Sequence, residues 1–120
     1  MLEKICTDLK TSKRLKELGF DDSESEFVYW NGKPEYYHNL PHFEIGRIED
    51  LITCYTLEQI LSELPQIVEI YNNIYHLMIS KNSIYYFNHS RIEIFANYQE
   101  NNLSTAAAKL WIKLKEDEII

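Results

Sequence analysis

The sequence predicts an α+β fold, in which an antiparallel β-meander and an additional β-hairpin pack with three short helices in a single domain, residues 1–120. Three observations lead to this prediction. Apolar residues recur at helical spacing near the start, the middle and the end of the chain. An Asn-Gly pair separates two aromatic runs, and residues 66–95 form a long isoleucine-rich and aromatic run that short polar stretches interrupt. Because these strands follow one another directly, they should pair antiparallel.

The first helix is expected to begin at Thr7, a favourable N-cap residue, and to end at Gly19, where glycine supplies the left-handed conformation. Leu15 and Leu18 give this helix one apolar side. The polar and acidic stretch 21–26 predicts a loop.

Asn31-Gly32 predicts a tight hairpin turn after the strand FVYW, because both residues accept the positive φ angles that such turns require. Pro34 lies in the returning arm and cannot donate a ladder hydrogen bond, so this arm is expected at a sheet edge or outside a sheet. Tyrosine and tryptophan are enriched at interfaces. The aromatic residues flanking the turn are therefore expected to contact a partner: Trp30, Tyr36 and Tyr37.

The stretch CYTLEQILSELP predicts the second helix. Thr56 stands at the N-cap and Gln59 at N3, which is the pattern of a capping box. Tyr55 and Ile60 occupy the two positions of a hydrophobic staple. Pro65 should end the helix, because proline cannot continue it.

The meander follows, with Asn72-Asn73 expected as its first two-residue turn. In that register Glu69 lies opposite His76, a titratable pair on one sheet face. With a second turn at Lys81-Asn82, one face becomes the core. Its members are Val68, Ile70, Tyr75, Leu77, Ile79, Ile84 and Tyr86.

The other face of this predicted sheet carries five large apolar residues: Ile67, Ile74, Met78, Tyr85 and Phe87. Leaving each of them in water forgoes roughly 1.5–3 kcal/mol. We therefore expect residues 20–47 to fold across part of this face. The exposed remainder, with Tyr85 or Phe87, is expected to contact a partner or a second copy.

The last helix is expected in the stretch NNLSTAAAKLWIKLKEDEII, with Ser104 as its N-cap. One side of this helix is apolar at helical spacing. That side consists of Ala107, Leu110, Trp111 and Leu114.

Charge and composition exclude several classes of protein. The net charge is −7, although residues 1–16 carry +3 and the remainder −10, so phosphate backbones are repelled by most of the chain and no nucleic-acid partner is expected. No stretch approaches the ~20 apolar residues of a membrane span, and the N-terminus lacks an apolar signal segment. Cys6 and Cys54 stand apart, which is typical of reduced, buried thiols in a cytoplasmic protein.

Motifs for catalysis, metals and cofactors are weak. His38, His42 and Glu44 cluster in HNLPHFE, but Pro41 argues against a helix there and no second ligand cluster exists. There is no GxSxG, and the three glycines are too scattered for a phosphate-binding loop. No metal, no cofactor and no catalytic residue is predicted.

Three segments carry a resemblance: CTDLKTSKRLKELGF, LITCYTLEQILSELP and LSTAAAKLWIKL. In this order they are similar to a group of small uncharacterised α+β proteins from phage and prophage-like elements of bacteria. Thr53 stands where that group often has proline. Since the shared motifs are helix caps and core residues, the resemblance implies a shared fold and no particular chemistry.

The function expected from the sequence is that of a small cytoplasmic interaction protein, from a mobile element, which binds another protein or itself. The alternative is a small-ligand binder or enzyme, and its candidate residues are His38, His42, Glu44, Glu69 and His76. An acidic mimic of DNA ranks last, because the carboxylates are dispersed rather than aligned in rows.

Overall fold

The computed structural model describes residues 5–23, 25–41 and 51–120, which form three α-helices and two antiparallel sheets. The predicted α+β class is therefore confirmed. In chain order the elements are α1 (Leu9–Glu17), β1 (Phe27–Trp30), β2 (Lys33–Tyr36), a 3₁₀ helix (Tyr37–Asn39), β3 (Thr53–Cys54), α2 (Leu57–Glu63), β4 (Ile67–Ile70), β5 (Asn73–Ile79), β6 (Ser83–Asn88), β7 (Glu93–Gln99) and α3 (Leu103–Glu116).

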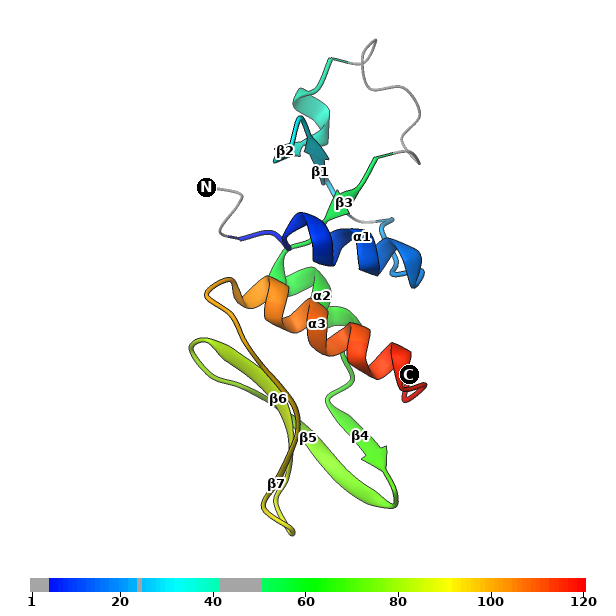
Figure 1. Ribbon diagram of the computed structural model, residues 1–120, viewed down its shortest axis with the longest axis vertical. Coiled ribbons are helices and arrows are strands. Elements are labelled where there is room, and N and C mark those ends of the chain that lie inside the picture. Colours follow the sequence, from blue (N-terminus) through cyan, green and yellow to red (C-terminus); the bar gives the residue numbers. More distant parts are fainter. Residues whose placement is uncertain (1–4, 24, 42–50) are drawn as a thin grey trace.

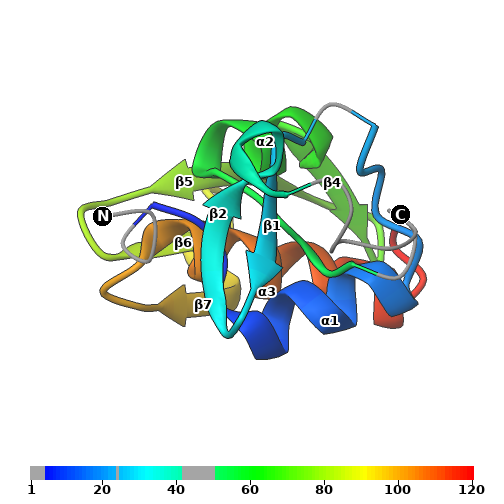
Figure 2. The same ribbon diagram turned by 90° about the horizontal axis from the view of Figure 1, so that it is seen from above.

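The elements form three layers (Figure 1). The large sheet, ordered β4-β5-β6-β7, lies at one end of the molecule, the three helices lie in the middle, and the small sheet, ordered β2-β1-β3, lies at the other end. Figure 2, seen from the side of the small sheet, shows β1 and β2 in front of the helices, nearer the viewer. The molecule is accordingly elongated, with extents of 56 × 26 × 19 Å.

The core lies between the helices and the inner face of the large sheet. Three consecutive alanines of α3 are completely buried, and their small side chains let this helix approach its neighbours closely. Phe20, after α1, packs edge-on against Tyr55 and Trp111 at ring separations of 4.7 and 4.9 Å. The predicted apolar side of α3 is confirmed, since all of its members are buried: Ala107, Leu110, Trp111 and Leu114.

The helix caps follow the prediction in one case and differ in two. Thr56 and Gln59 form the predicted capping box of α2. The N-cap of α1 is Asp8 rather than Thr7, and that of α3 is Asn102 rather than Ser104. Each displaced residue bonds a distant segment instead. The Thr7 hydroxyl accepts a hydrogen bond from the Tyr55 backbone amide at 3.1 Å, and the Ser104 hydroxyl donates to the Ile5 carbonyl at 2.6 Å.

The predicted β1–β2 hairpin is confirmed. Asn31 and Gly32 form its turn with φ angles of 53° and 81°, and β1 pairs with β2 from Phe27–Tyr36 to Trp30–Lys33. The strand with Pro34 lies at the edge of the small sheet, as proline requires.

The first turn of the meander differs from the prediction by one residue. Tyr71 and Asn72, rather than Asn72 and Asn73, hold the positive φ angles, and Asn73 begins β5. The Asn73 side-chain amide donates to the Tyr71 carbonyl at 3.2 Å, which closes this turn. Glu69 therefore pairs with Ile74.

The second turn is confirmed, because β5 and β6 pair as predicted, with Leu77 opposite Tyr86 and Ile79 opposite Ile84. The inner face is buried at Val68, Tyr75, Ile84 and Tyr86, whereas Ile79, at the end of its strand, is 48% exposed. None of the helices in residues 5–23, 25–41 and 51–120 has the length and apolar character needed to cross a bilayer.

Candidate functional site

The outer face of the large sheet, which points away from the helices, is the first candidate site. Alternation along the strands places one row across all four of them, because Ile67 pairs with His76, His76 with Phe87, and Phe87 with Ile94. Ile74 lies beside this row. We define the outer face as Ile67, Ile74, His76, Met78, Tyr85, Phe87 and Ile94.

The outer face is both apolar and open. Ile67, Ile74 and Ile94 are 54%, 55% and 57% exposed. The Phe87 ring packs edge-on against His89, at 4.9 Å between ring centres, and His89 lies 5.4 Å from His76. Contiguous exposed apolar patches on a folded protein mark contact surfaces more often than isolated apolar residues do.

The expectation that residues 20–47 cover this face is wrong for the described part of that segment. The β1–β2 hairpin lies beyond the helices, at the opposite end of the molecule (Figure 1). Contacts with β3 and with the N-terminal segment hold it there. Phe27 pairs with Cys54 of β3, and the Tyr29 hydroxyl donates to the Thr7 carbonyl at 2.7 Å. The hairpin extends the small sheet instead of closing over the large one.

The five predicted partner-contact residues fall into two separate groups. Tyr85 and Phe87 lie on the outer face and are half-buried. The other three lie around the small sheet: Trp30, Tyr36 and Tyr37. Trp30 and Tyr37 pack against a small buried cluster, and the Tyr36 ring lies 5.1 Å from that of His38. The structure thus does not bring these five residues together.

The residues of the predicted ligand or enzyme site are also separated. His38 is exposed, with its ring beside Tyr36 and Tyr37. Glu69 and His76 do not pair, because the register of β4 and β5 places Ile74 opposite Glu69 and Ile67 opposite His76. The remaining two candidates lie outside the described residues: His42 and Glu44.

The expected absence of a metal and a cofactor stays a prediction. Within residues 5–23, 25–41 and 51–120, no group of three His, Cys, Asp or Glu side chains is arranged to hold a metal ion. This finding does not extend to His42 and Glu44.

Both cysteines are buried and neither forms a disulfide, as expected for reduced thiols. The two thiols are close enough to form a hydrogen bond. This bond with Cys6 is the largest cause that raises the pKa of the Cys54 thiol, and burial raises it further. A thiol with a raised pKa and little solvent access is a poor nucleophile. The structure gives this pair a packing role between the N-terminal segment and β3.

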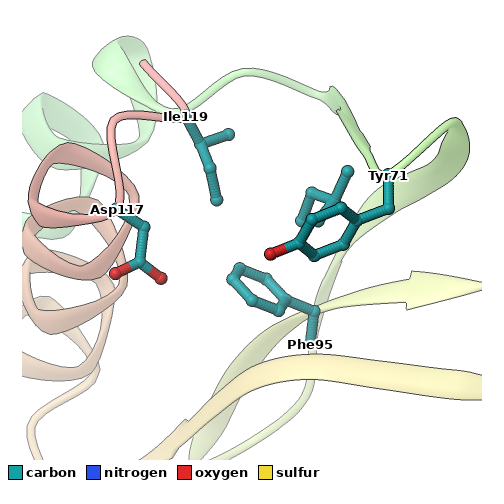
Figure 3. Close-up of a pocket in the computed structure, with 5 residues that line it drawn as sticks. Tyr71, Phe95, Asp117 and Ile119 are labelled. Atoms are coloured by element: carbon teal, nitrogen blue, oxygen red, sulfur yellow. The ribbon is translucent and has the colours of Figure 1, made fainter.

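A pocket that the sequence did not predict lies where the β4–β5 turn, β7 and the segment after α3 meet. It has a volume of about 500 Å³ (Figure 3). Its lining residues come from three separate stretches of chain, which explains why no local motif marked it: Ile70, Tyr71, Phe95, Asp117 and Ile119. The one local signal is Tyr71, a bulky residue at a turn position with a φ angle of 50°.

Comparison with known proteins finds no family model, no curated protein and no solved structure that matches this chain. The relation to phage-encoded proteins therefore stays an expectation that rests on three short sequence segments. The function has to be argued from the surfaces of the chain itself.

Proposed function

We propose that this chain is a cytoplasmic protein-binding module, from a phage-like mobile element, and that its outer face binds a second copy of the chain. The observation that supports the proposal is the row Ile67–His76–Phe87–Ile94, which crosses the whole sheet and has isoleucines about half exposed at both ends. Burying each large apolar side chain contributes roughly 1.5–3 kcal/mol, and covering several of them together favours association.

A second copy suits this face because the row is nearly the same when it is read from either end. It begins and ends with isoleucine and has a ring at both central positions. A two-fold axis parallel to the strands places β4 of one copy over β7 of the other, so that Ile67 lies opposite Ile94. Two aligned sheets pack roughly 10 Å apart, a spacing that interdigitating side chains fill.

Charge permits this pairing despite the net charge of −7. Glu69, on the edge strand β4, is the one charged side chain at the outer-face positions of the four described strands. The proposed two-fold axis places the two copies of Glu69 at opposite edges of the contact, so they do not face each other, and solvent and salt screen them there. The face also offers no set of charges that would select a partner of opposite sign.

The test measures molar mass by light scattering across a range of protein concentrations. The wild-type chain is expected to approach twice its mass of 14.3 kDa. Ile67→Lys should restore the monomer, because it places a charge in an apolar contact. Ile92→Lys is the matched control. Ile92 is 79% exposed but lies in the β6–β7 turn, so this variant should still dimerise.

A second pair of substitutions tests the orientation of the two copies. Ile67→Lys and Ile94→Glu are each expected to weaken association. Combined in one chain, they should restore it, since the lysine of one copy then meets the glutamate of the other. A wild-type chain that stays monomeric at every concentration would falsify the proposal, and failure of the double variant to recover would exclude this two-fold arrangement.

A further inference from the structure

The pocket beside the end of α3 combines aromatic rings with negative charge. Figure 3 shows the Tyr71 ring, the Phe95 ring and the Asp117 carboxylate around a common space, with Ile119 closing one side. Its volume of about 500 Å³ lies within the range of small-ligand sites. The site is separate from the outer face and does not depend on the proposed dimer.

The negative character of the pocket has two sources. Asp117 is the C-cap of α3, and its backbone amide donates to the Lys113 carbonyl at 3.0 Å. The last carbonyl groups of a helix carry a partial negative charge, which favours cations. The Asp117 carboxylate adds a full negative charge at the same place.

Tyr71 supplies an aromatic surface at the mouth of the pocket. It is 93% exposed, and it occupies a turn position that favours asparagine or glycine, with a φ angle of 50°. Residues held in sparsely populated backbone regions cluster at functional sites. The Phe95 ring, half-buried on β7, forms the floor opposite it.

We propose that this pocket binds a guanidinium group. A guanidinium is planar, stacks on aromatic faces and donates two parallel hydrogen bonds to one carboxylate. Tyr71 and Phe95 provide the faces, and Asp117 provides the carboxylate. A compact ammonium group would gain the charge interaction but neither the stacking nor the paired hydrogen bonds.

Lys113 competes for the same carboxylate. Its Nζ lies 2.9 Å from Asp117 Oδ2, and both side chains are well exposed. Exposed ion pairs of this kind are weak, so a better-matched cation can displace or share the contact. Removing this competing cation should therefore raise the affinity, so Lys113→Gln is expected to strengthen guanidinium binding.

The test is an NMR titration of the whole chain with N-acetyl-arginine amide, and with N-acetyl-lysine amide as the ammonium probe. Saturable shifts are expected at Tyr71, Phe95 and Asp117 with the arginine probe, and much weaker binding with the lysine probe. Tyr71→Ser should weaken arginine binding about three- to fivefold, the effect of losing one exposed cation–π contact. Asp117→Asn should weaken it by a similar or larger factor.

Glu118→Gln is the matched control, since it removes a neighbouring carboxylate that does not line the pocket. It should leave the affinity within about twofold of wild type, which is the size of a long-range screened charge effect. An unchanged spectrum outside the pocket would show that each variant is folded.

The titration also separates the two sources of a guanidinium. Agmatine represents a free small molecule, and a glycine-flanked single-arginine peptide represents the side chain of a protein partner. Tighter binding of either one supports the proposal and identifies the source. The proposal is overturned if no pocket resonance shifts, if the lysine probe binds as tightly as the arginine probe, or if Asp117→Asn has no effect.

Discussion

Single side chains decide how the helices begin. Thr7 is completely buried, and its hydroxyl forms a 2.7 Å hydrogen bond with Ser12 in addition to accepting one from the Tyr55 amide. Asp8 takes over the cap of α1, and its carboxylate accepts from the Thr11 amide at 2.8 Å. Of these two adjacent polar residues, Asp8 thus caps the helix and Thr7 bonds a distant segment.

The Thr56 cap gives a prediction at this scale. The Thr56 hydroxyl accepts from the Gln59 amide, and the Gln59 side chain accepts from the Thr56 amide at 2.9 Å. Thr56→Ala should lower the free energy of unfolding by about 1 kcal/mol, as expected for a lost N-cap. Urea unfolding measures the change. Ser62→Ala, at an exposed position of the same helix, is the control and should change stability by no more than ~0.5 kcal/mol. An unchanged midpoint in Thr56→Ala would contradict the role of the cap.

Buried tyrosines give a prediction about alkaline pH. Burial raises the pKa of Tyr86 and of Tyr55 above the ordinary value of about 10. Above about pH 10 these tyrosines lose their protons in the unfolded chain but keep them in the folded chain. The free energy of unfolding is therefore undiminished below about pH 10 and falls as the pH rises further. Urea unfolding between neutral pH and about pH 11 should show this loss.

Tyr86→Phe isolates the contribution of one hydroxyl. At neutral pH it should lose about 1 kcal/mol, because the Tyr86 hydroxyl donates to the Pro65 carbonyl at 2.7 Å. Its stability should then fall less steeply than that of the wild type at alkaline pH, since one of the buried phenols with a raised pKa is gone. Equal alkaline slopes in the two proteins would refute the assignment to Tyr86.

At the scale of elements, the first turn of α3 fastens the N-terminal segment. The Asn102 carboxamide oxygen accepts from the Ser104 amide at 2.9 Å, while its nitrogen donates to the Cys6 carbonyl at 2.6 Å. Thr105 accepts from the Asp8 amide at 3.1 Å. One helix start therefore links residues that are almost a hundred positions apart in the chain.

Two substitutions of Asn102 separate capping from this long-range link. Asn102→Ala removes both and should lower the free energy of unfolding by about 2 kcal/mol, a cap plus one hydrogen bond. Asn102→Ser keeps an oxygen for the cap, but its shorter side chain loses the donor to Cys6, so it should lose roughly half as much. Thermal or urea unfolding measures both variants. If the serine variant is as unstable as the alanine variant, the link to Cys6 outweighs the cap.

At the scale of the whole molecule, the two sheets belong to buried clusters of very different size. The large sheet shares its cluster with all three helices, whereas the small sheet has Val28 and Leu40 as the buried members of a separate cluster. Regions with few buried apolar contacts open at lower free energy than the main core does.

Hydrogen exchange should show this difference directly. Amides of β1 and β2 are expected to exchange through local opening, well before those of β6 and α3, which should approach the global stability. Val28→Ala should speed exchange in the small sheet and leave β6 nearly unchanged. Equal protection across both sheets, or a Val28→Ala effect spread over the whole chain, would show that the molecule opens as one unit.

Features that depend on neighbouring residues were determined by the sequence alone. The Asn31-Gly32 turn, the Thr56 capping box and the Lys81-Asn82 turn all occur as predicted. The capping box depends on hydrogen bonds between side chains and nearby backbone, and the Asn31-Gly32 turn depends on residues that accept a positive φ, in each case within about four residues. Lys81 and Asn82 do not hold positive φ angles, and the register of β5 with β6 is what places their turn. The buried side of α3 was equally predictable, because helical spacing places its apolar residues together.

Only the tertiary structure decided which of several similar side chains caps a helix or closes a turn. Thr7 and Ser104 are good caps by themselves, but distant segments use their hydroxyls, and adjacent Asp8 and Asn102 cap the helices instead. The β4–β5 turn shifted by one residue for a related reason, since Asn73 closes the turn from the first position of its strand.

The candidate sites depend even more on the tertiary structure. The hairpin that was expected to cover the outer face is held at the opposite end of the molecule by β3 and Thr7, so the outer face stays open. The pocket at Asp117 exists only because a turn, a strand and a helix end meet. Short sequence motifs predict helix starts and turns because the hydrogen bonds of a cap or a turn join residues only a few positions apart. Surfaces and pockets form from contacts between remote segments, and these are selected when the whole chain packs.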